Sequence, residues 1–312
     1  VLFRSNADSL GIGRPSAASP SSTTLPREMA GPRTILHIPH DSRIIPPDVR
    51  VAFVLSESAL RAELNAMTDA FTAELFDPPE PVMRCIYPVS RLVVDPERFV
   101  DDTVEPMARR GMGVIYTRTS EGAPLRVAPN PATRAALLAR FYWPHHAALT
   151  AATDGALAAH GRCRILDCHS FAAVALPYEL DQAPTRPDIC LGTDPFHTPP
   201  ALYERADALF RAAGFTVARD RPFAGTMVPS SHYRKTRVLE SRRLQVGGLA
   251  VHSRLAGHIV DEGDVIDATG QVGEQVADPF AAFTVLAKFP ARFDDASLIA
   301  MSAAPKGFYI NG

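Results

Sequence analysis

The stretch that decides the fold lies at residues 34–42 and reads TILHIPHDS. Its first five residues are β-branched or otherwise apolar apart from His37, which is typical of a strand buried inside a sheet. The strand is followed by Pro39, His40 and small polar residues. A second stretch at residues 163–170, CRILDCHS, has the same form and carries His169. Two such strand ends predict an α/β protein whose polar side chains gather at the carboxyl edge of the sheet.

Outward from these strands, the hydrophobic pattern alternates between helical and strand-like segments. The spacing predicts helices over 56–76, 132–160 (interrupted at Pro144) and 199–213, and further strands over 82–87, 91–94, 113–119, 188–192 and 215–219. No composition break divides residues 31–290. We therefore expect a single α/β domain over 31–290, with a mainly parallel or mixed sheet flanked by helices.

The two ends of the chain differ from this domain. Residues 6–24 are rich in Ser, Ala, Gly and Pro, so they bury too little apolar surface to offset the entropy of ordering. The sequence predicts a disordered tail over 1–30, whose first five residues resemble a translated sequencing adapter. Residues 291–312 are expected to form a C-terminal tail.

Composition excludes several classes of function. The net charge of −2 gives no sign of a nucleic-acid or membrane-surface partner. No apolar run approaches the roughly 18 residues that span a bilayer. The four cysteines have no CxxC spacing, which favours free thiols in a reducing compartment and predicts a cytoplasmic protein.

The two histidines at the strand ends point to metal chemistry. Two imidazoles and a carboxylate from elsewhere in the chain make a three-ligand zinc site that keeps one position open for water. The alternative is that His40 and His169 only cap their strands or satisfy loop groups. Two such strand ends in one chain favour the metal site over that alternative.

Six stretches, taken in their order along the chain, resemble the N-formylglutamate amidohydrolase family. They are HIPHDSRIIP at 37–46, MTDAFTAELF at 67–76, SRLVVDPER at 90–98, DCHSF at 167–171, DICLGT at 188–193 and RPFAG at 221–225. The resemblance implies a fold of the zinc carboxypeptidase and aspartoacylase type. It also implies zinc-dependent hydrolysis of an N-acyl amino acid, typically N-formyl-L-glutamate to glutamate and formate in histidine degradation.

The expected strand ends and the family resemblance together suggest the metal ligands. His40 and His169 are the two expected nitrogen ligands. Arg43 stands three residues after His40, so the chain has no HxxE ligand pair. Asp69, in the second matching stretch, is the candidate third ligand, with a solvated helix carboxylate as the alternative. Asp167 is expected to hydrogen-bond a ligand imidazole and orient it.

The substrate of such an enzyme is a small acidic molecule, and arginine binds carboxylates bidentately. By the resemblance, Arg91 and Arg98 are assigned to the substrate carboxylate, with surface arginines as the alternative. The loop of Phe223 and Gly225 is assigned to the substrate side. The family's Glu-x-Asn-Arg segment is missing, which leaves Glu240 as the candidate general base.

Two further interpretations of the function stay open. One is a related zinc deacylase or carboxypeptidase, and the other is a degenerate member that binds metal or ligand without turnover. A serine hydrolase is disfavoured, because no GxSxG follows a strand. His145 and His146 lie in a stretch that also resembles the family, and we expect them to pack or cap at a helix kink.

Overall fold

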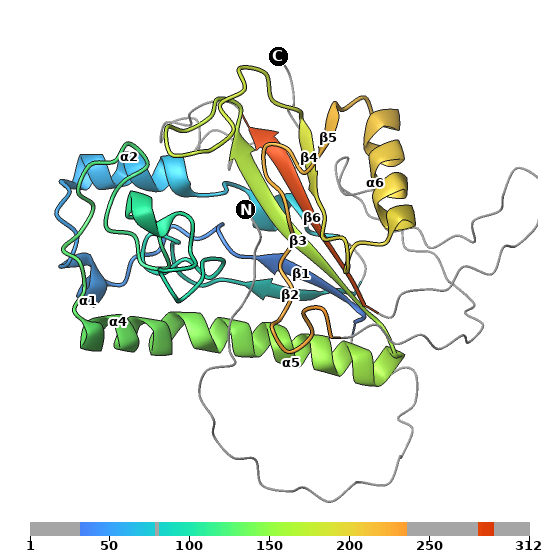
Figure 1. Cartoon of the computed structure of the whole chain (residues 1–312), viewed down its shortest axis with the longest axis horizontal. Helices are drawn as coiled ribbons and strands as arrows, with labels where there is room; N and C mark the ends of the chain where they lie inside the picture. Colours follow the sequence, from blue (N-terminus) through green and yellow to red (C-terminus); the bar gives the residue numbers. More distant parts are fainter. Residues whose placement is uncertain (1–31, 79–80, 236–279, 290–312) are drawn as a thin grey trace, which may run out of the picture.

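The computed structural model describes residues 32–78, 81–235 and 280–289 of the chain. Six strands form one sheet in the order β2-β1-β3-β6-β4-β5 (Figure 1). The strands are β1 (Thr34–Ile38), β2 (Met83–Ile86), β3 (Cys163–Ala172), β4 (Ile189–Gly192), β5 (Val217–Arg219) and β6 (Phe280–Phe289). The helices are α1 (Pro47–Arg50), α2 (Glu57–Met67), α3 (Thr72–Leu75), the 3₁₀ turn η2 (Ala108–Arg110), α4 (Pro131–Leu137), the π-helix η3 (Leu138–Tyr142), α5 (Trp143–His160) and α6 (Pro200–Ala212).

The sheet is mixed, as the sequence predicts. Strand β1 runs parallel to both β2 and β3, and β3 runs parallel to β6. Strand β6 is antiparallel to β4, which in turn is parallel to β5. In the β1–β3 register His37 lies opposite Asp167. Strand β3 continues to Ala172, beyond the end of β1, so His40 and His169 reach the same level at the carboxyl edge.

Helices cover both faces of the sheet, with the long α5 along one side and α6 on the other (Figure 1). On the α5 face, Ile35 and Ile165 pack with Leu149 of the helix. On the opposite face, Leu36 packs in a cluster with Phe210 of α6. Successive strand residues alternate between these two layers, as the pleat requires. The chain is therefore a single α/β domain with a sheet between helical layers.

A third apolar cluster lies beyond the ends of β1 and β2. It is built from irregular segments and the neighbouring helices, and its fully buried members include Tyr87, Leu92, Val114, Tyr116 and Leu125. Leu92, Val93 and Val94 of segment 90–98 belong to this cluster, and the charged residues of the segment follow them directly. The candidate site lies where it meets the carboxyl edge of the sheet.

The helix expected over 56–76 is broken in the structure. Helix α2 starts at an N-cap Ser56 whose hydroxyl accepts from the Ala59 amide, and it stops at Met67. The Asp69 amide then donates to the His40 carbonyl at 3.0 Å, and Phe71 takes a left-handed φ of 60°. A tertiary hydrogen bond thus replaces the helical one, and the amphipathic spacing does not reveal it.

Two expected strands are also wrong. Segments 91–94 and 113–119 form no strand, because they lie buried in the third cluster instead of joining the sheet. The Asp95 amide donates to the Val114 carbonyl at 2.8 Å and links the two segments. The remaining expected elements appear, shortened or lengthened at their ends, and the interruption near Pro144 takes the form of a π-helix just before it.

Several expectations fall on residues that the structure does not describe. They are the tails at 1–30 and 291–312 and the candidate base Glu240. Within the described ranges, no helix is both long enough and apolar enough to cross a bilayer.

Candidate metal centre

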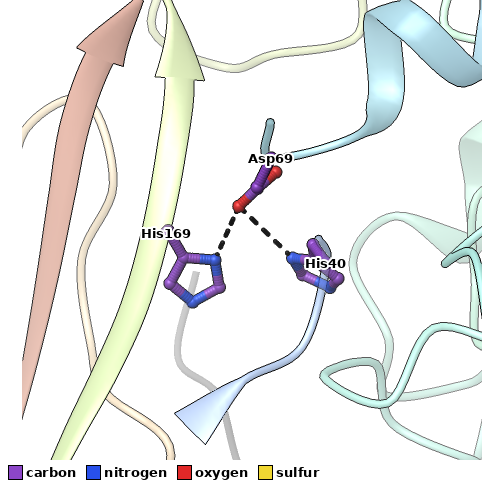
Figure 2. Close-up of side chains that lie close together, drawn as sticks. All are labelled: His40, Asp69 and His169. Carbon is purple, nitrogen blue, oxygen red and sulfur yellow. Dashed lines mark hydrogen bonds and ion pairs between the residues drawn. The ribbon is translucent and has the colours of Figure 1, made fainter. Parts of the chain in front are cut away.

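Two imidazoles and a carboxylate converge at the carboxyl edge of the sheet. His40 follows β1, His169 lies in β3, and Asp69 lies in the loop between α2 and α3. One Asp69 oxygen, Oδ2, lies 2.9 Å from Nδ1 of His169 and 3.7 Å from Nδ1 of His40 (Figure 2). The two rings are 5.2 Å apart between centroids. The structure thus brings together the three residues expected to hold a metal.

These distances suit a shared cation. Donor atoms about 2.0–2.1 Å from a tetrahedral zinc are about 3.3 Å from one another, and the two Asp69 distances bracket that value. All three side chains are buried, and Nδ1 of His40 has no hydrogen-bond partner among the described residues. A buried ring nitrogen without a partner is costly, and a metal ion at this position removes that cost.

The far side of each imidazole faces other carboxylates. Nε2 of His40 donates to Oδ1 of Asp95 at 2.9 Å. Nε2 of His169 lies 3.2 Å from Asp167 and 3.3 Å from Glu97. A hydrogen on Nε2 leaves the Nδ1 lone pair free to bind a metal, which is how carboxylates orient histidine ligands. Asp167 lies near Nε2 of His169, but this nitrogen makes no hydrogen bond among the described residues, so an orienting role for Asp167 stays a prediction.

The charges around the two imidazoles do not balance. Asp69, Asp95, Asp167 and Glu97 all lie within 4 Å of a ring nitrogen of His40 or His169. In the part of the chain that the structure describes, arginines pair with only the first two of these carboxylates: Arg91 contacts Asp69 and Asp95, and Arg98 contacts Asp95. Glu97 is buried, and neither of its carboxylate oxygens accepts a hydrogen bond from a described residue. A divalent cation would supply the missing positive charge.

The pKa values of the two histidines reflect this excess of negative charge. Burial and the Arg91 charge lower the pKa of His40, but Asp95, Glu97 and Asp69 outweigh them, so the pKa is raised. Burial also lowers the pKa of His169, yet Glu97, Asp167 and Asp69 raise it well above its usual value. The metal-free site therefore draws protons to both imidazoles.

Arg91 and Arg98 do not lie on the surface. Both line the same cavity, which has a volume of about 1410 Å³ and is also lined by His40 and His169. Arg91 directs Nε and Nη2 at Oδ2 of Asp95, at 3.2 and 2.9 Å. Nη1 of Arg98 lies 3.5 Å from Glu105. The structure brings both arginines to the site expected to bind the substrate.

Phe223 and Gly225 also line this cavity. The Phe223 ring meets Phe171 edge-on, at 5.7 Å between centroids. Gly225 has φ of 93°, a conformation that favours glycine. Its carbonyl oxygen would clash with a Cβ on Gly192, so that position also needs glycine.

Sequence reasoning missed three residues of this network: Asp95, Glu97 and His37. The first two lie in the stretch quoted at 90–98, directly after the apolar run that ends at Val94. That change from apolar to charged residues is the same signal that identified His40. His37 looked like a strand residue, but its Nδ1 lies 2.7 Å from Oδ1 of Asp167. With Glu97 and Asp167 it forms a second buried group of possible metal donors.

Comparisons with known proteins found a sequence family and structural neighbours. The sequence profile of the N-formylglutamate amidohydrolase family matches residues 33–245. An N-formylglutamate amidohydrolase from Ralstonia eutropha JMP134, known from a crystal structure, superposes with a TM-score of 0.57 at 20% identity, covering 85% of this chain and 84% of its own. A gene product of Agrobacterium tumefaciens gives a TM-score of 0.47 at 20% identity, covering 64% and 73%. No curated protein matches by sequence.

Proposed function

Because the chain belongs to the N-formylglutamate amidohydrolase family, we propose that it hydrolyses the amide of an N-acyl amino acid with the help of a zinc ion. His40, Asp69 and His169 would hold the ion. The observation that carries this proposal is their convergence on one point (Figure 2), and His40, Asp69 and His169 all line a large cavity. Two imidazoles and one carboxylate are a common ligand set of catalytic zinc, which keeps one position open.

When bound, zinc polarises the acyl carbonyl and lowers the pKa of a water molecule. The chain's own residues prepare the site for it. Asp95 accepts a hydrogen bond from Nε2 of His40 and fixes that ring in place, and Asp167 lies 3.2 Å from Nε2 of His169. Asp167 is itself held by the Met227 amide and the Thr284 hydroxyl, at 3.2 and 3.1 Å. The ligands are thus pre-organised, which limits the entropy lost on metal binding.

The substrate we propose is acidic, with N-formyl-L-glutamate as the first candidate. Nη1 of Arg91 lies 3.6 Å from Asp69, whereas the other two nitrogens of its guanidinium are engaged by Asp95. Arg91 lines the cavity, and this remaining edge of its guanidinium suits a carboxylate of the substrate. Arg98, which lines the same cavity, adds positive charge, and Phe223 and Gly225 contribute to the cavity wall. The setting we propose is histidine degradation in the cytoplasm, which agrees with four free and buried cysteines.

Glu240 remains our candidate for moving the proton between water and the leaving amine. Its replacement by glutamine should lower kcat and leave metal content unchanged. If turnover is unaffected, another carboxylate serves as the base.

The function is tested with a panel of substrates and a metal assay. The purified chain should contain about one equivalent of zinc and release formate from N-formyl-L-glutamate. The cavity is far larger than a formyl group requires, so N-acetyl amino acids and short peptides belong in the panel. Preference for one of these would identify a related deacylase or carboxypeptidase. Zinc binding with no turnover of any substrate would identify a degenerate member, and absence of metal would refute the proposed site.

A further inference from the structure

The start of α5 and the π-helix before it direct three polar side chains toward the candidate site. We propose that Tyr142, His145 and His146 are positioning residues, which fix the groups that orient the metal ligands. This inference rests on the proposed function and extends it. The three residues are spaced i, i+3 and i+4, so they share one helical face. Neither the sequence pattern nor the proposed chemistry had given them a role beyond packing.

His145 acts through β1 and β3. Its Nε2 lies 2.9 Å from Nε2 of His37, and Nδ1 of His37 lies 2.7 Å from Oδ1 of Asp167. Asp167 in turn faces Nε2 of His169 at 3.2 Å. The alternation of side chains along the strands supports this path. His37 follows Ile35 by two residues and Asp167 follows Ile165 by two, and both isoleucines face α5. His37 and Asp167 therefore point to the same side of the sheet as α5. A row of buried side chains thus connects α5 to one proposed ligand.

His146 and Tyr142 act on the segment that orients the other ligand. Nε2 of His146 donates to the Pro96 carbonyl at 2.8 Å, and the Tyr142 hydroxyl donates to the Arg98 carbonyl at 3.1 Å. The centroids of the two aromatic rings lie 4.2 Å apart. Two anchors therefore fix the backbone on both sides of Glu97, next to the carboxylate of Asp95 that holds His40.

The π-helix has a local cause that agrees with this role. Pro144 has no N–H, so it cannot donate to the carbonyl four residues earlier, and the turn over Leu138–Tyr142 widens to π geometry instead. An extra residue in a turn rotates the next part of the helix by about 100° relative to a regular α-helix. Such turns are frequent at functional sites, and here the rotation sets the direction of His145 and His146.

Both histidines act as neutral donors. Burial lowers the pKa of His146 to about 4, and burial together with the neighbouring His37 lowers that of His145. A neutral imidazole has one N–H and one acceptor nitrogen. Each ring can therefore make a directed hydrogen bond, which plain packing would not require.

The first test uses the full chain loaded with cobalt(II), whose visible absorption reports ligand geometry. His145→Ala and His146→Ala should each weaken cobalt affinity about tenfold or more and shift the absorption band, as loss of groups behind metal ligands does elsewhere. The glutamine variants, which keep an N–H donor, should recover most of the affinity. Thr153→Ala is the matched control, because this buried hydroxyl of α5 donates to the Leu149 carbonyl of its own helix at 2.8 Å. Alanine variants with wild-type affinity and spectrum would overturn the proposal.

A second measurement needs no metal. In the metal-free chain, His146→Ala and Tyr142→Phe should accelerate hydrogen exchange at the amides of Asp95 and Glu97 by up to about tenfold, the effect of losing one hydrogen bond. Thr153→Ala should leave these amides unchanged. If the wild type takes up no cobalt, the proposed metal function fails, and exchange still decides on the positioning residues. Unchanged exchange in both variants would refute their role.

Discussion

Asp95→Asn is the most direct test of how the buried charges are arranged. Asparagine keeps the shape of the side chain and removes its charge. Asp95 is fully buried, and its Oδ2 accepts from Arg91 at 2.9 Å and from the Tyr116 hydroxyl at 2.6 Å. Arg98 approaches the same oxygen at 3.5 Å. Burial raises the pKa of Asp95, but Arg91, His40 and Arg98 hold it well below its usual range.

The magnitude depends on the charges that the substitution leaves unpaired. Removing one partner of a buried ion pair costs about 3–5 kcal/mol, because the other charge stays buried. Arg98 keeps Glu105 at 3.5 Å and Arg91 keeps Asp69 at 3.6 Å, so each arginine retains one carboxylate and the loss falls at the lower end of this range. We therefore expect a loss of about 3 kcal/mol in the free energy of unfolding, or a fall of roughly 6–12 °C in Tm.

Urea denaturation of the metal-free chain, followed by circular dichroism, measures this loss. Asp48→Asn is the matched control, because Asp48 pairs with Arg140 at the surface with both side chains about half exposed or more. Exposed ion pairs contribute little to stability, so the control should unfold at the same urea concentration as the wild type. If Asp95→Asn also unfolds at the same urea concentration as the wild type, the buried network does not depend on this carboxylate and the reasoning is refuted.

Three further predictions concern the site itself. Asp69→Asn should lower bound zinc, measured by plasma mass spectrometry, to well under half of the wild-type content, and unchanged content would exclude Asp69 as a ligand. The metal-free chain should lose stability as pH rises above about 6.5, which is the pKa of histidine in the unfolded chain. The reason is that His40 and His169 have raised pKa values in the folded state and bind more protons there. Added zinc should offset the loss, and a free energy of unfolding that does not change with pH would contradict the prediction. Arg91→Lys should raise KM for N-formyl-L-glutamate about tenfold or more with a smaller effect on kcat, since lysine lacks the planar fork, whereas steady-state kinetics like those of the wild type would remove the arginine from substrate binding.

Much of the fold follows from local sequence, and the exceptions share a cause. Strands β1 and β3 and helix α6 are predictable because their apolar spacing and end residues agree. The helix expected over 56–76 is not, since the amide of Asp69 bonds the His40 carbonyl, which lies far away in sequence. Segment 91–94 has the composition of a strand but packs in the third apolar cluster. Tertiary contacts decide these cases, and the spacing of apolar residues along the sequence carries no information about such contacts.

The same limit applies to the site. His40, His169 and Asp69 could be selected from short stretches of sequence. Few residue types bind metals, and these three lie at or near the ends of predicted strands and helices. The partners of the imidazoles, Asp95 and Glu97, come from an irregular segment whose course depends on the whole domain. His37 needed the β1–β3 register to be placed beside Asp167. Residue type thus identifies ligands more readily than the groups that hold them.

Strand β6 lies between β3 and β4 in the sheet, although β4 ends at Gly192 and β6 begins only at Phe280. During synthesis β3 and β4 therefore leave the ribosome long before the strand that pairs with both. Until β6 arrives, each presents an open edge that can pair with another chain. Its Thr284 also supplies a hydrogen bond to Asp167, so the candidate site is completed only at that last step. Closing so distant a pairing is slow, and we expect the nascent chain to depend on chaperones until residue 289 has emerged.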